Sequence, residues 1–364
     1  MSDGIVIAGG GLAGQRCAET LRREGFEGPV RIVCGEDHLP YDRPPLSKAF
    51  LAGEVEAVDL QLRPEGWHAE QAIELVLGDP VTGIDPDAQQ VTLASGATLS
   101  YEHLVAATGS RARTLPVFDG LENVHTLRDL PDARRLRATL GQGTRLTVIG
   151  AGLIGQEIAA TAKGLGAEVT LVEAAALPLE RALHPELARW LVDLQREQGV
   201  DVRLGVTADE PTVAGGRVTA LTLSDGTAVE TDELLVAIGV VPNIEWLGDD
   251  PEAVLARPEI HVAGDLAGGD HWELAASQGR AVAKAIVQAE PAAPSISGWW
   301  SDIHGVRLQG LGDPFGADTL EIDGDPAERS FSAVALRDGR AVAALAVGRP
   351  RDVPGLRARL TDDQ

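Results

Sequence analysis

Two glycine-rich loops, one near residue 10 and one near residue 150, constrain the fold of this chain more than any other feature. Each has the pattern G-x-G-x-x-G between an apolar strand-like run and a helix-like run, and the glycines are Gly9, Gly11 and Gly14, then Gly150, Gly152 and Gly155. The first glycine of such a unit allows a tight turn, the second lets the backbone approach a pyrophosphate, and the third lets helix and strand pack closely. The helix N-terminus stabilises the phosphate charge. The sequence therefore predicts two dinucleotide-binding α/β units.

An acidic residue follows each loop at the distance expected for a ribose contact. Glu36 comes after the strand-like "VRIVC", and Glu173 ends the strand-like "EVTLVE". A carboxylate at this place accepts hydrogen bonds from ribose hydroxyls. A 2′-phosphate beside Glu173 would meet a like charge, which costs about 4 kcal/mol for charges ~4 Å apart at an effective dielectric of about 20. No arginine follows directly in "EAAALP", so we expect NADH rather than NADPH at the second loop.

An internal repeat closes the two halves. "VTLASGATLSYEHLVAATG" spans residues 91–109, and "LTLSDGTAVETDELLVAIG" spans residues 221–239. The glycine turns in "ASGA" and "SDGT" favour hairpins. In both halves we expect two strands joined by a turn, followed by a buried strand that ends in a glycine, Gly109 or Gly239.

These patterns predict three domains. Residues 1–113 and 241–292 are expected to form the domain of the first loop, and residues 114–240 that of the second. The composition of "PAAPSISG" (291–298) is that of a linker. Residues 299–364 are expected to form a small α+β domain, in which the D-G turn of "FSAVALRDGRAVAALAVG" predicts a β-hairpin.

Composition excludes several classes of partner. The chain has 364 residues and a net charge of −24 at pH 7, so nucleic acid is not expected as a partner. No run approaches the ~18 apolar residues of a membrane span, and the start "MSDG" lacks a secretory pattern. Cys17 and Cys34 form no C-x-x-C motif and fit a reducing cytoplasm. We predict no metal site, because the histidines do not cluster with cysteines or acids at ligand spacing.

Four further motifs point to a family. They are "PYDRPPLSK" (40–48), "AATG" (106–109), "VAGD" (262–265) and "WSD" (300–302). With the two loops, they make the chain resemble the FAD-dependent ferredoxin reductases, the NADH-using reductase components of bacterial oxygenase and cytochrome P450 systems. Rubredoxin reductases and apoptosis-inducing-factor-like flavoproteins are similar. The resemblance implies two Rossmann-like domains in a glutathione-reductase-like arrangement, a small C-terminal domain, and the cofactors FAD and NADH.

The resemblance also implies roles for individual residues. The FAD pyrophosphate would be held by Gly9, Gly11, Ala13 and Gly14, and its adenosine ribose by Glu36. Further FAD contacts are implied for Arg43, Lys48, Val81, Arg128, Asp265, Trp272 and Trp300. NADH contacts are implied for Gly150, Gly152, Leu153, Ile154, Gly155, Glu173 and Gly239. The neighbouring Trp299 is expected to be a packing residue.

Lys48 and Glu157 are the predicted catalytic residues. Lys48 is expected near the reactive edge of the flavin, and Glu157 of "GLIGQE" is expected to reach towards it. Reduced flavin is anionic, so a fixed cation stabilises the product of hydride transfer. A carboxylate partner keeps this cation from being a lone buried charge. Disulfide reductases of similar architecture place a redox-active cysteine pair near the flavin, where this chain has "RPPLSK", so electrons are expected to leave the flavin directly.

The chain departs from the family pattern in three places. The stretch between "VVPN" (240–243) and "IHVAGD" (260–265) and the loop "LAGGDHW" (266–272) are shorter than usual, and the chain stops early. The chain therefore resembles a trimmed member, with its cofactor contacts kept and its docking surface altered. The arginine-rich "RPRDVPGLRAR" (349–359) predicts either a docking patch for an acidic ferredoxin or a solvated terminal helix.

Three functions are compatible with these motifs. The favoured one is an NADH-dependent reductase that passes single electrons to a ferredoxin or rubredoxin-type protein serving a monooxygenase or P450, as a monomer or homodimer. The second is an NADH oxidase or a reductase of quinones and other small oxidants. The third, from another class, is an NADH-sensing flavoprotein whose turnover is incidental.

Overall fold

The computed structural model describes residues 3–269, 271–291, 296 and 298–362. Its contacts divide the chain into two compact units. Unit 1 comprises Met1–Asp42, Ala57–Arg111 and Val241–Ser295, and unit 2 comprises Arg43–Glu56, Ala112–Val240 and Ile296–Gln364. The chain passes between the units five times, and two of these passages lie within short strands, β8 (Ser110–Ala112) and β17 (Val240–Pro242).

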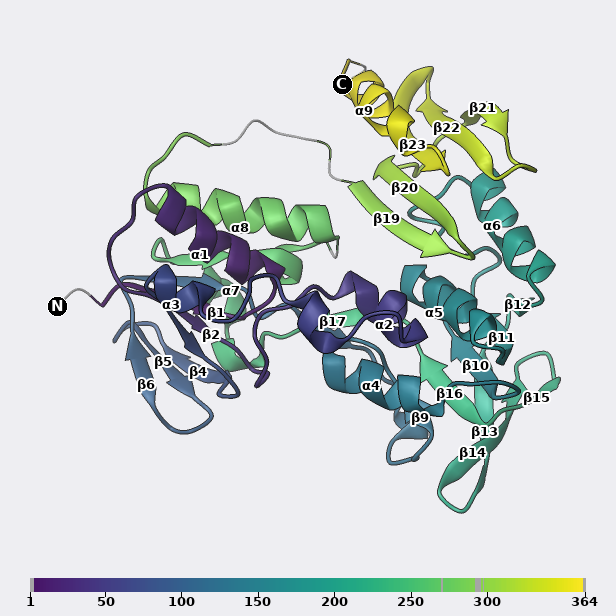
Figure 1. Ribbon diagram of the computed structural model, residues 1–364, viewed down its shortest axis with the longest axis horizontal. Coiled ribbons are helices and arrows are strands. Elements are labelled where there is room, and N and C mark those ends of the chain that lie inside the picture. Colours follow the sequence, from purple (N-terminus) through teal and green to yellow (C-terminus); the bar gives the residue numbers. More distant parts are fainter. Residues whose placement is uncertain (1–2, 270, 292–295, 297, 363–364) are drawn as a thin grey trace. The chain divides into compact units, whose positions relative to one another are not determined.

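Unit 1 is built on a five-stranded parallel sheet with the strand order β18-β7-β1-β2-β3 (Figure 1). The strands are β1 (Ile5–Ala8), β2 (Val30–Val33), β3 (Ile73–Val76), β7 (His103–Ala106) and β18 (Ile260–Val262). The helices are α1 (Leu12–Arg23), α3 (Trp67–Glu70), α7 (Pro251–Leu255) and α8 (Trp272–Ile286). Helices α1 and α8 lie side by side, so closely that a Cβ on Gly279 would stand 2.1 Å from the carbonyl oxygen of Ala13. The apolar run of β1 is buried along its whole length, as a central parallel strand requires.

Unit 2 contains a second five-stranded parallel sheet, in the order β12-β11-β10-β16-β9. Its strands are β9 (Val124–His125), β10 (Arg145–Ile149), β11 (Glu168–Glu173), β12 (Asp201–Leu204) and β16 (Glu233–Val236). Its helices are α2 (Ala49–Ala52), α4 (Leu130–Thr139), α5 (Leu153–Gly164) and α6 (Pro185–Glu197). The order is that of unit 1, with β10, β11, β12 and β16 in the places of β1, β2, β3 and β7. The two halves of the chain therefore repeat one topology.

Each parallel sheet is accompanied by a three-stranded antiparallel sheet, which contains the predicted hairpin, β5–β6 or β14–β15, and one further strand that precedes the repeat. In unit 1 this sheet consists of β4 (Val81–Asp85), β5 (Gln90–Leu93) and β6 (Thr98–Ser100). In unit 2 it consists of β13 (Ala208–Ala214), β14 (Arg217–Leu223) and β15 (Ala228–Glu230). The turns contain Gly96 and Gly226, both with positive φ. The buried strand that follows each hairpin, β7 or β16, then enters the parallel sheet.

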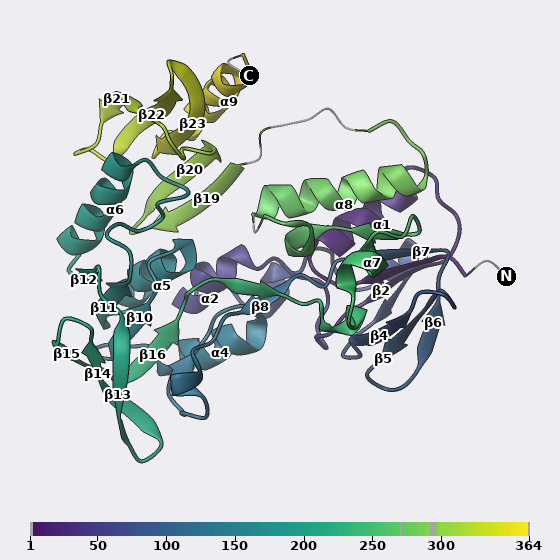
Figure 2. The ribbon, with the colours of Figure 1, turned by 180° about the vertical axis from the view of Figure 1, so that it is seen from behind.

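The C-terminal part of unit 2 is an antiparallel sheet with one terminal helix (Figure 2). The sheet has the order β19-β20-β23-β22-β21. Its elements are β19 (Gly298–Ile303), β20 (Val306–Gly312), β21 (Thr319–Asp325), β22 (Ser330–Arg337), β23 (Arg340–Val347) and α9 (Val353–Asp362). The predicted hairpin is β22–β23, and its turn residues Asp338 and Gly339 both have positive φ, 52° and 77°. Such a turn matches the right-handed twist of the strands it joins.

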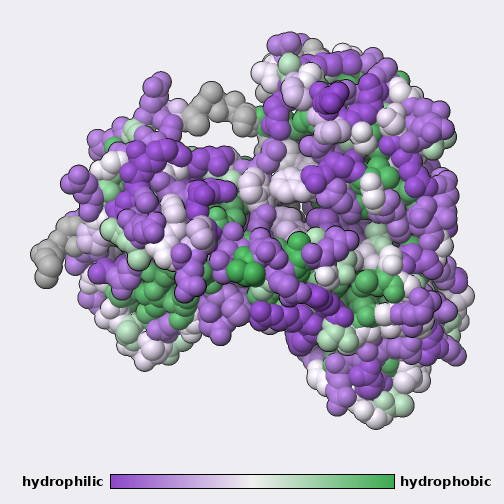
Figure 3. Space-filling view, in the orientation of Figure 1, coloured by the Kyte–Doolittle hydropathy of each residue, from purple (hydrophilic) through white to green (hydrophobic). Residues whose placement is uncertain are grey.

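The division by contacts differs from the three predicted domains in two places, because residues 299–364 group with residues 114–240 in one unit and residues 43–56 change unit. Residues 43–56 were assigned to the first domain, but α2 packs against α4 and α5 and so groups with unit 2. The remaining unit boundaries fall within a few residues of the predicted ones. The face drawn in Figure 3 is covered mainly by hydrophilic residues, in keeping with the acidic composition.

Candidate functional site

The two glycine loops have nearly the same geometry. Gly9 and Gly150 have positive φ, 124° and 101°, and lie tight against the strand that follows the hairpin. A Cβ on Gly14 would stand 2.1 Å from the carbonyl oxygen of Gly9, and one on Gly155 would stand 2.0 Å from that of Gly150. The first and third glycines are therefore required by packing within the protein.

The second glycine of each loop faces open space. A Cβ on Gly11 or on Gly152 would have no protein atom within 4 Å. Both residues are the N-caps of their helices, α1 and α5, with extended backbone and no side-chain cap. The first backbone N–H groups of both helices thus face a surface to which an anion can come close. This geometry fits a dinucleotide pyrophosphate at each loop.

In unit 1 two predicted FAD-binding residues lie at the carboxyl edge of the parallel sheet, where Glu36 follows β2 and Asp265 follows β18. Gly109, the last residue of the "AATG" motif, follows β7 at the same edge. Glu36 accepts a hydrogen bond of 2.6 Å from the hydroxyl of Tyr41, and Asp265 accepts one of 2.5 Å from Ser110. Ligands of open α/β sheets bind at this edge.

In unit 2 the predicted NADH-binding residues gather at the corresponding edge. Glu173 ends β11 and Gly239 follows β16. Oε2 of Glu173 accepts from the backbone N–H of Ala151, at 2.8 Å, within the glycine loop. The Glu173 carboxylate is thus already fixed beside the loop where a ribose would lie. Ile154, in the first turn of α5, is a large hydrophobic residue with 37% exposure, and Leu153 packs partly into the core.

Lys48 and Glu157 form a direct ion pair within unit 2. Nζ of Lys48 lies 2.8 Å from Oε2 of Glu157, and the side chains are 16% and 6% exposed. Lys48 follows the short 3-10 helix Pro44–Ser47, which begins with Pro44 and Pro45, and Glu157 lies in the second turn of α5. Helix α5 therefore begins at the second glycine loop and carries the carboxylate that holds Lys48.

Further predicted FAD contacts lie around the same segment of the chain. In unit 2, Arg43 donates a hydrogen bond of 2.8 Å to the backbone carbonyl of Arg128. In unit 1, Trp272 donates from Nε1 to Oδ1 of Asp42, at 2.6 Å. Five of the eight residues 41–48 therefore have a side-chain hydrogen bond: Tyr41, Asp42, Arg43, Ser47 and Lys48.

The remaining predicted residues take ordinary places in the two units. Val81 begins β4 and pairs with Leu93. Trp300 lies on β19 and is partly buried, and its neighbour Trp299 is 7% exposed, in the hydrophobic cluster beneath the C-terminal sheet. None of these observations tests a flavin contact, and the FAD role of Val81 and Trp300 stays a prediction.

Both cysteines are buried and unreactive by environment. Cys17 lies in α1, and Cys34 follows β2 with its Sγ beneath Gly10 of the first loop. Burial raises the pKa of each thiol to about 12. Neither thiol can therefore act as a thiolate relay near neutral pH.

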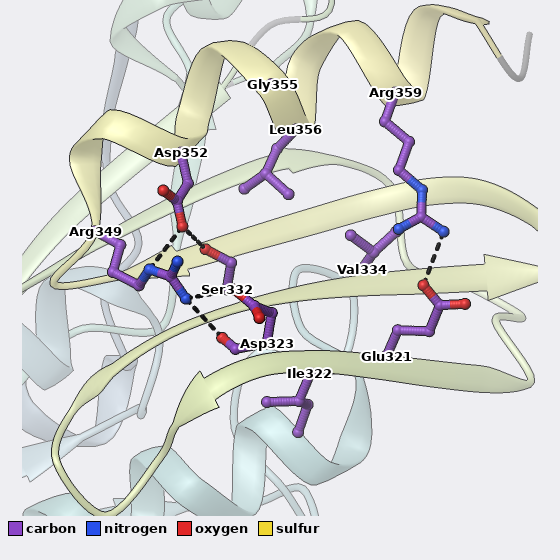
Figure 4. Close-up of a pocket in the computed structure, with 10 residues that line it drawn as sticks. All are labelled: Glu321, Ile322, Asp323, Ser332, Val334, Arg349, Asp352, Gly355, Leu356 and Arg359. Atoms are coloured by element: carbon purple, nitrogen blue, oxygen red, sulfur yellow. Dashed lines mark hydrogen bonds and ion pairs between the residues drawn. The ribbon is translucent and has the colours of Figure 1, made fainter.

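The arginine-rich C-terminal segment is paired within its own domain. Figure 4 shows a groove between α9 and strands β21 and β22. Across it, Arg349 lies 2.7 Å from Asp323 and Arg359 lies 2.8 Å from Glu321, and Arg349 also pairs at 2.7 Å with Asp352 on its own side. These contacts pair two arginines of the segment with acids of the same domain. The expectation of a basic docking patch is therefore weakened, and the helical alternative describes residues 353–362.

Sequence reasoning missed two residues at the Lys48–Glu157 pair. The hydroxyl of Ser47 donates to Oε2 of Glu157, and the hydroxyl of Ser301 donates to Oε1 at 2.7 Å. Both lie inside the motifs "PPLSK" and "WSD". In those motifs the sequence predicted roles for the charged and aromatic residues and none for the serines. Only the packing of the strand on the helix brings Ser301 to this carboxylate.

The stretch that is shorter than usual is nevertheless folded. It contains a 3-10 turn, Glu245–Leu247, and helix α7, whose N-cap Asp250 accepts from the backbone N–H of Ala253. Trp246 is 6% exposed and donates from Nε1 to the backbone carbonyl of Asn243, at 3.2 Å. Across the residues that the structure describes, no helix is both long and apolar enough to cross a membrane.

Comparison with known families matches nearly the whole chain. The model of the family described as pyridine nucleotide-disulphide oxidoreductase matches residues 3–279, and a model described as reductase C-terminal matches residues 299–364. The ferredoxin reductase subunit of 5,5′-dehydrodivanillate O-demethylase from Sphingobium sp. is 36% identical, over 98% of this chain and 93% of that protein. Putidaredoxin reductase from Pseudomonas putida is 37% identical, over 99% of this chain and 92% of that protein.

A solved structure extends this similarity to three dimensions. The reductase chain in the crystal structure of the covalent putidaredoxin reductase–putidaredoxin complex superposes with a TM-score of 0.94 at 34% identity. The match covers 99% of this chain and 93% of that chain. The resemblance seen in the sequence motifs is thus confirmed, and with it the fold class of two Rossmann-like units and a small C-terminal domain.

Proposed function

The chain belongs to the pyridine nucleotide-disulphide oxidoreductase family, and from this premise we propose that it is a flavoprotein that uses NADH to reduce a ferredoxin-type iron–sulfur protein. One observation carries the proposal. The chain has two open phosphate cradles, and the helix that begins at the second one holds Lys48, in the segment predicted to face the flavin, through Glu157. A protein that binds only one nucleotide would not need a contact between the predicted flavin-facing segment and the helix of a second cradle.

FAD is the cofactor at the first cradle and NADH the substrate at the second. When bound, FAD supplies the redox chemistry that links a donor of two electrons, as hydride, to an acceptor of one electron at a time. At the first cradle, Gly11 lets the FAD pyrophosphate approach the first backbone N–H groups of α1, Gly9 and Gly14 give the loop its shape, and Glu36 would bind the adenosine ribose. At the second cradle, Gly152 plays the same part for NADH, Gly150 and Gly155 shape the loop, and Glu173 discriminates against a 2′-phosphate by charge.

By the family resemblance, Lys48 would supply a fixed positive charge to bound FAD. Its side chain is 16% exposed and is oriented by Glu157 rather than left in a solvated conformation. A preorganised cation stabilises negative charge that develops during hydride transfer without reorganisation at that moment. Glu157 keeps the lysine from being an unpaired buried charge.

The acceptor is proposed from the relatives and from the cysteines. The relatives are named as reductases of ferredoxins that serve an O-demethylase, or of putidaredoxin. Cys17 and Cys34 are both buried free thiols with pKa values raised to about 12 by burial, so the chain offers no dithiol to accept electrons from the flavin. We therefore place a ferredoxin serving an oxygenase or P450 downstream. Free cysteines and the use of NADH support a cytoplasmic location.

Anaerobic rapid mixing tests this function. The purified yellow protein is mixed with NADH and separately with NADPH, and flavin absorbance is followed before a ferredoxin is added. We expect rapid bleaching by NADH only, followed by reoxidation when oxidised ferredoxin is supplied. A colourless protein would contradict the proposal at its base. Bleaching that oxygen reverses quickly and ferredoxin does not would instead assign the chain to the oxidases.

A further inference from the structure

The carboxylate of Glu157 is the meeting point of three separate parts of the chain. Oε2 receives the ammonium of Lys48 and the hydroxyl of Ser47, and Oε1 receives the hydroxyl of Ser301. All of these residues lie in unit 2. Counted over the whole residue, the exposed fraction is 5% for Glu157, 4% for Ser47 and 0% for Ser301. A buried ion pair is tolerated only when its remaining lone pairs are also hydrogen-bonded, and the two serines meet this requirement.

We propose that Ser301 is a positioning residue for the Lys48–Glu157 pair, and that the C-terminal sheet thereby takes part in electron transfer. The inference rests on the proposed function, since the pair matters to activity only if Lys48 faces the flavin. Its structural half, the control of Lys48 by Ser301 through Glu157, stands on the hydrogen bonds among these residues.

Strand β19 explains how Ser301 reaches the carboxylate. Side chains alternate along a strand, so Trp299, Ser301 and Ile303 share one face. Trp299 and Ile303 lie in the same buried cluster as Ala160, which is on the face of α5 that also carries Glu157. Apolar packing on both sides thus holds the strand against the helix, with the serine opposite the glutamate.

A serine in this apolar face is costly unless it makes a hydrogen bond. Leaving a buried hydroxyl unsatisfied costs roughly 1–3 kcal/mol, and the bond to Glu157 removes that cost. A valine or alanine would pack at this position without any partner. Ser301 is therefore best explained by what it does to Glu157.

The bond from Ser301 fixes which carboxylate oxygen faces Lys48. The terminal torsion of a glutamate is broad and roughly two-fold, so one anchored oxygen sets the direction of the other. Ser47 donates to Oε2, the oxygen that also receives the ammonium, and its Oγ lies 3.4 Å from a second acceptor, the carbonyl oxygen of Pro44, so Ser301 alone holds Oε1 among the residues that the structure describes. With Oε1 held by Ser301, Oε2 points to the ammonium.

The peptide bond of Ser47 adds a second connection to the same helix. Thr161, one turn after Glu157, donates from its hydroxyl to the backbone carbonyl of Ser47, at 2.8 Å. The segment that carries Lys48 is therefore tied to α5 by both backbone and side chain. Removing Ser301 leaves these ties intact, so a Ser301 variant perturbs the carboxylate without releasing the segment.

The chain is well suited to observing Lys48 directly. It has only three lysines in its sequence, Lys48, Lys163 and Lys284. With ¹⁵N-labelled lysine, the ammonium groups of the oxidised FAD-loaded protein give at most three NMR signals, and the Lys48→Ala variant identifies one of them. A hydrogen-bonded, largely buried ammonium exchanges its protons slowly and gives the sharpest signal.

Four variants then decide the proposal. Ser301→Ala removes the donor, Ser301→Cys keeps the shape with a weak donor, and Ser301→Thr keeps the hydroxyl. Ser332→Ala is the matched control, because Ser332 is also a buried serine of the C-terminal sheet and donates to a carboxylate, Asp352, at 2.6 Å, in the groove of Figure 4. Each is examined by lysine NMR without NADH and by anaerobic flavin reduction at saturating NADH.

We expect Ser301→Ala to shift or broaden the Lys48 signal and to slow flavin reduction about tenfold, the effect of losing one charge-assisted hydrogen bond. NADH affinity should stay unchanged, Ser301→Thr should restore both readouts, and Ser332→Ala should alter neither. If the alanine variant does not fold, Ser301→Cys replaces it in both measurements, and the same changes are expected. A wild-type Lys48 signal and reduction rate in Ser301→Ala would overturn the proposal. If NADH fails to bleach even the wild-type protein, the proposed function fails, and the NMR arm alone decides the role of Ser301.

Discussion

The ammonium of Lys48 lies 2.8 Å from Oε2 of Glu157, across 109 positions of sequence. One partner follows a proline-rich turn and the other lies in the helix that begins at the second glycine loop. The pair joins the segment predicted to face the flavin to the element predicted to bind NADH. The following predictions test this relationship and the two cradles around it.

Replacing Lys48 should slow flavin reduction without loss of FAD. Lys48→Ala removes the fixed cation, and removal of one preorganised electrostatic group typically costs about 100-fold or more in rate. The first glycine loop does not involve this side chain, so the purified variant should remain yellow. Anaerobic rapid mixing with NADH measures the rate. Lys163→Ala, another lysine of unit 2 on the same helix α5, is the control and should reduce at the wild-type rate.

Glu173→Gln should narrow the preference for NADH over NADPH. Both oxygens of Glu173 accept backbone hydrogen bonds, from Ala151 and from Ala175, and glutamine keeps one acceptor oxygen for the bond to the loop at Ala151 while the repulsion of a 2′-phosphate is lost. The ratio of kcat/KM values for the two coenzymes measures this. Glu168→Gln, at the exposed opposite end of β11, should leave the ratio unchanged. An unaltered ratio in Glu173→Gln would remove this residue from the coenzyme site.

The glycines of one loop should respond differently to alanine. A Cβ on Gly11 meets no protein atom within 4 Å, and its φ of −75° suits alanine, so Gly11→Ala should fold normally but lose FAD. A Cβ on Gly14 would stand 2.1 Å from the carbonyl oxygen of Gly9, so Gly14→Ala should unfold at a lower temperature even as apoprotein. Bound-flavin absorbance and thermal unfolding separate the effects. Tight FAD binding by Gly11→Ala would place the pyrophosphate elsewhere.

His304→Asn should flatten the pH dependence of stability. Burial lowers the pKa of His304 from 6.5 to about 4, and its Nε2 lies 2.8 Å from Oε1 of Gln195. Between these pH values the unfolded chain binds more protons than the folded one, so the free energy of unfolding falls as pH drops from 6.5 towards 4. Asparagine tolerates the φ of 50° at this turn. Chemical denaturation at pH 7 and pH 5 should show a smaller loss in the variant than in the wild type.

The two thiols should be inert in the folded protein. Burial raises the pKa of both Cys17 and Cys34 to about 12, so at pH 8 only about one thiol in ten thousand is a thiolate. A disulfide reagent such as DTNB should react with neither thiol until the protein is denatured, and with both afterwards. Rapid labelling of the native protein would contradict the buried environment and reopen a thiol route for electrons.

The sequence alone determined the parts of this protein that depend on local pattern. The spacing of Gly9, Gly11 and Gly14 predicted a strand, loop and helix because each glycine has a local steric reason. The repeat that ends at Gly109 and Gly239 predicted equivalent strands. The structure shows these strands, β7 and β16, each paired within a parallel sheet, with the glycine after its carboxyl end. The D-G dipeptide at 338–339 predicted its hairpin. The two-residue turn needs a positive φ at both positions, and few types of residue adopt one.

Tertiary structure alone decided what surrounds the charges. Residues 43–56 join unit 2 because α2 packs against α4 and α5, with Arg137 of α4 over the ring of Phe50, an arrangement that no local pattern encodes. Arg349 and Arg359 form ion pairs with acidic residues of strand β21, so their charges are paired within the domain. Ser301 meets Glu157 because a strand packs on a helix 144 positions away in sequence. Hydrogen bonds between distant residues depend on side-chain packing, and packing is settled only when the whole chain has folded.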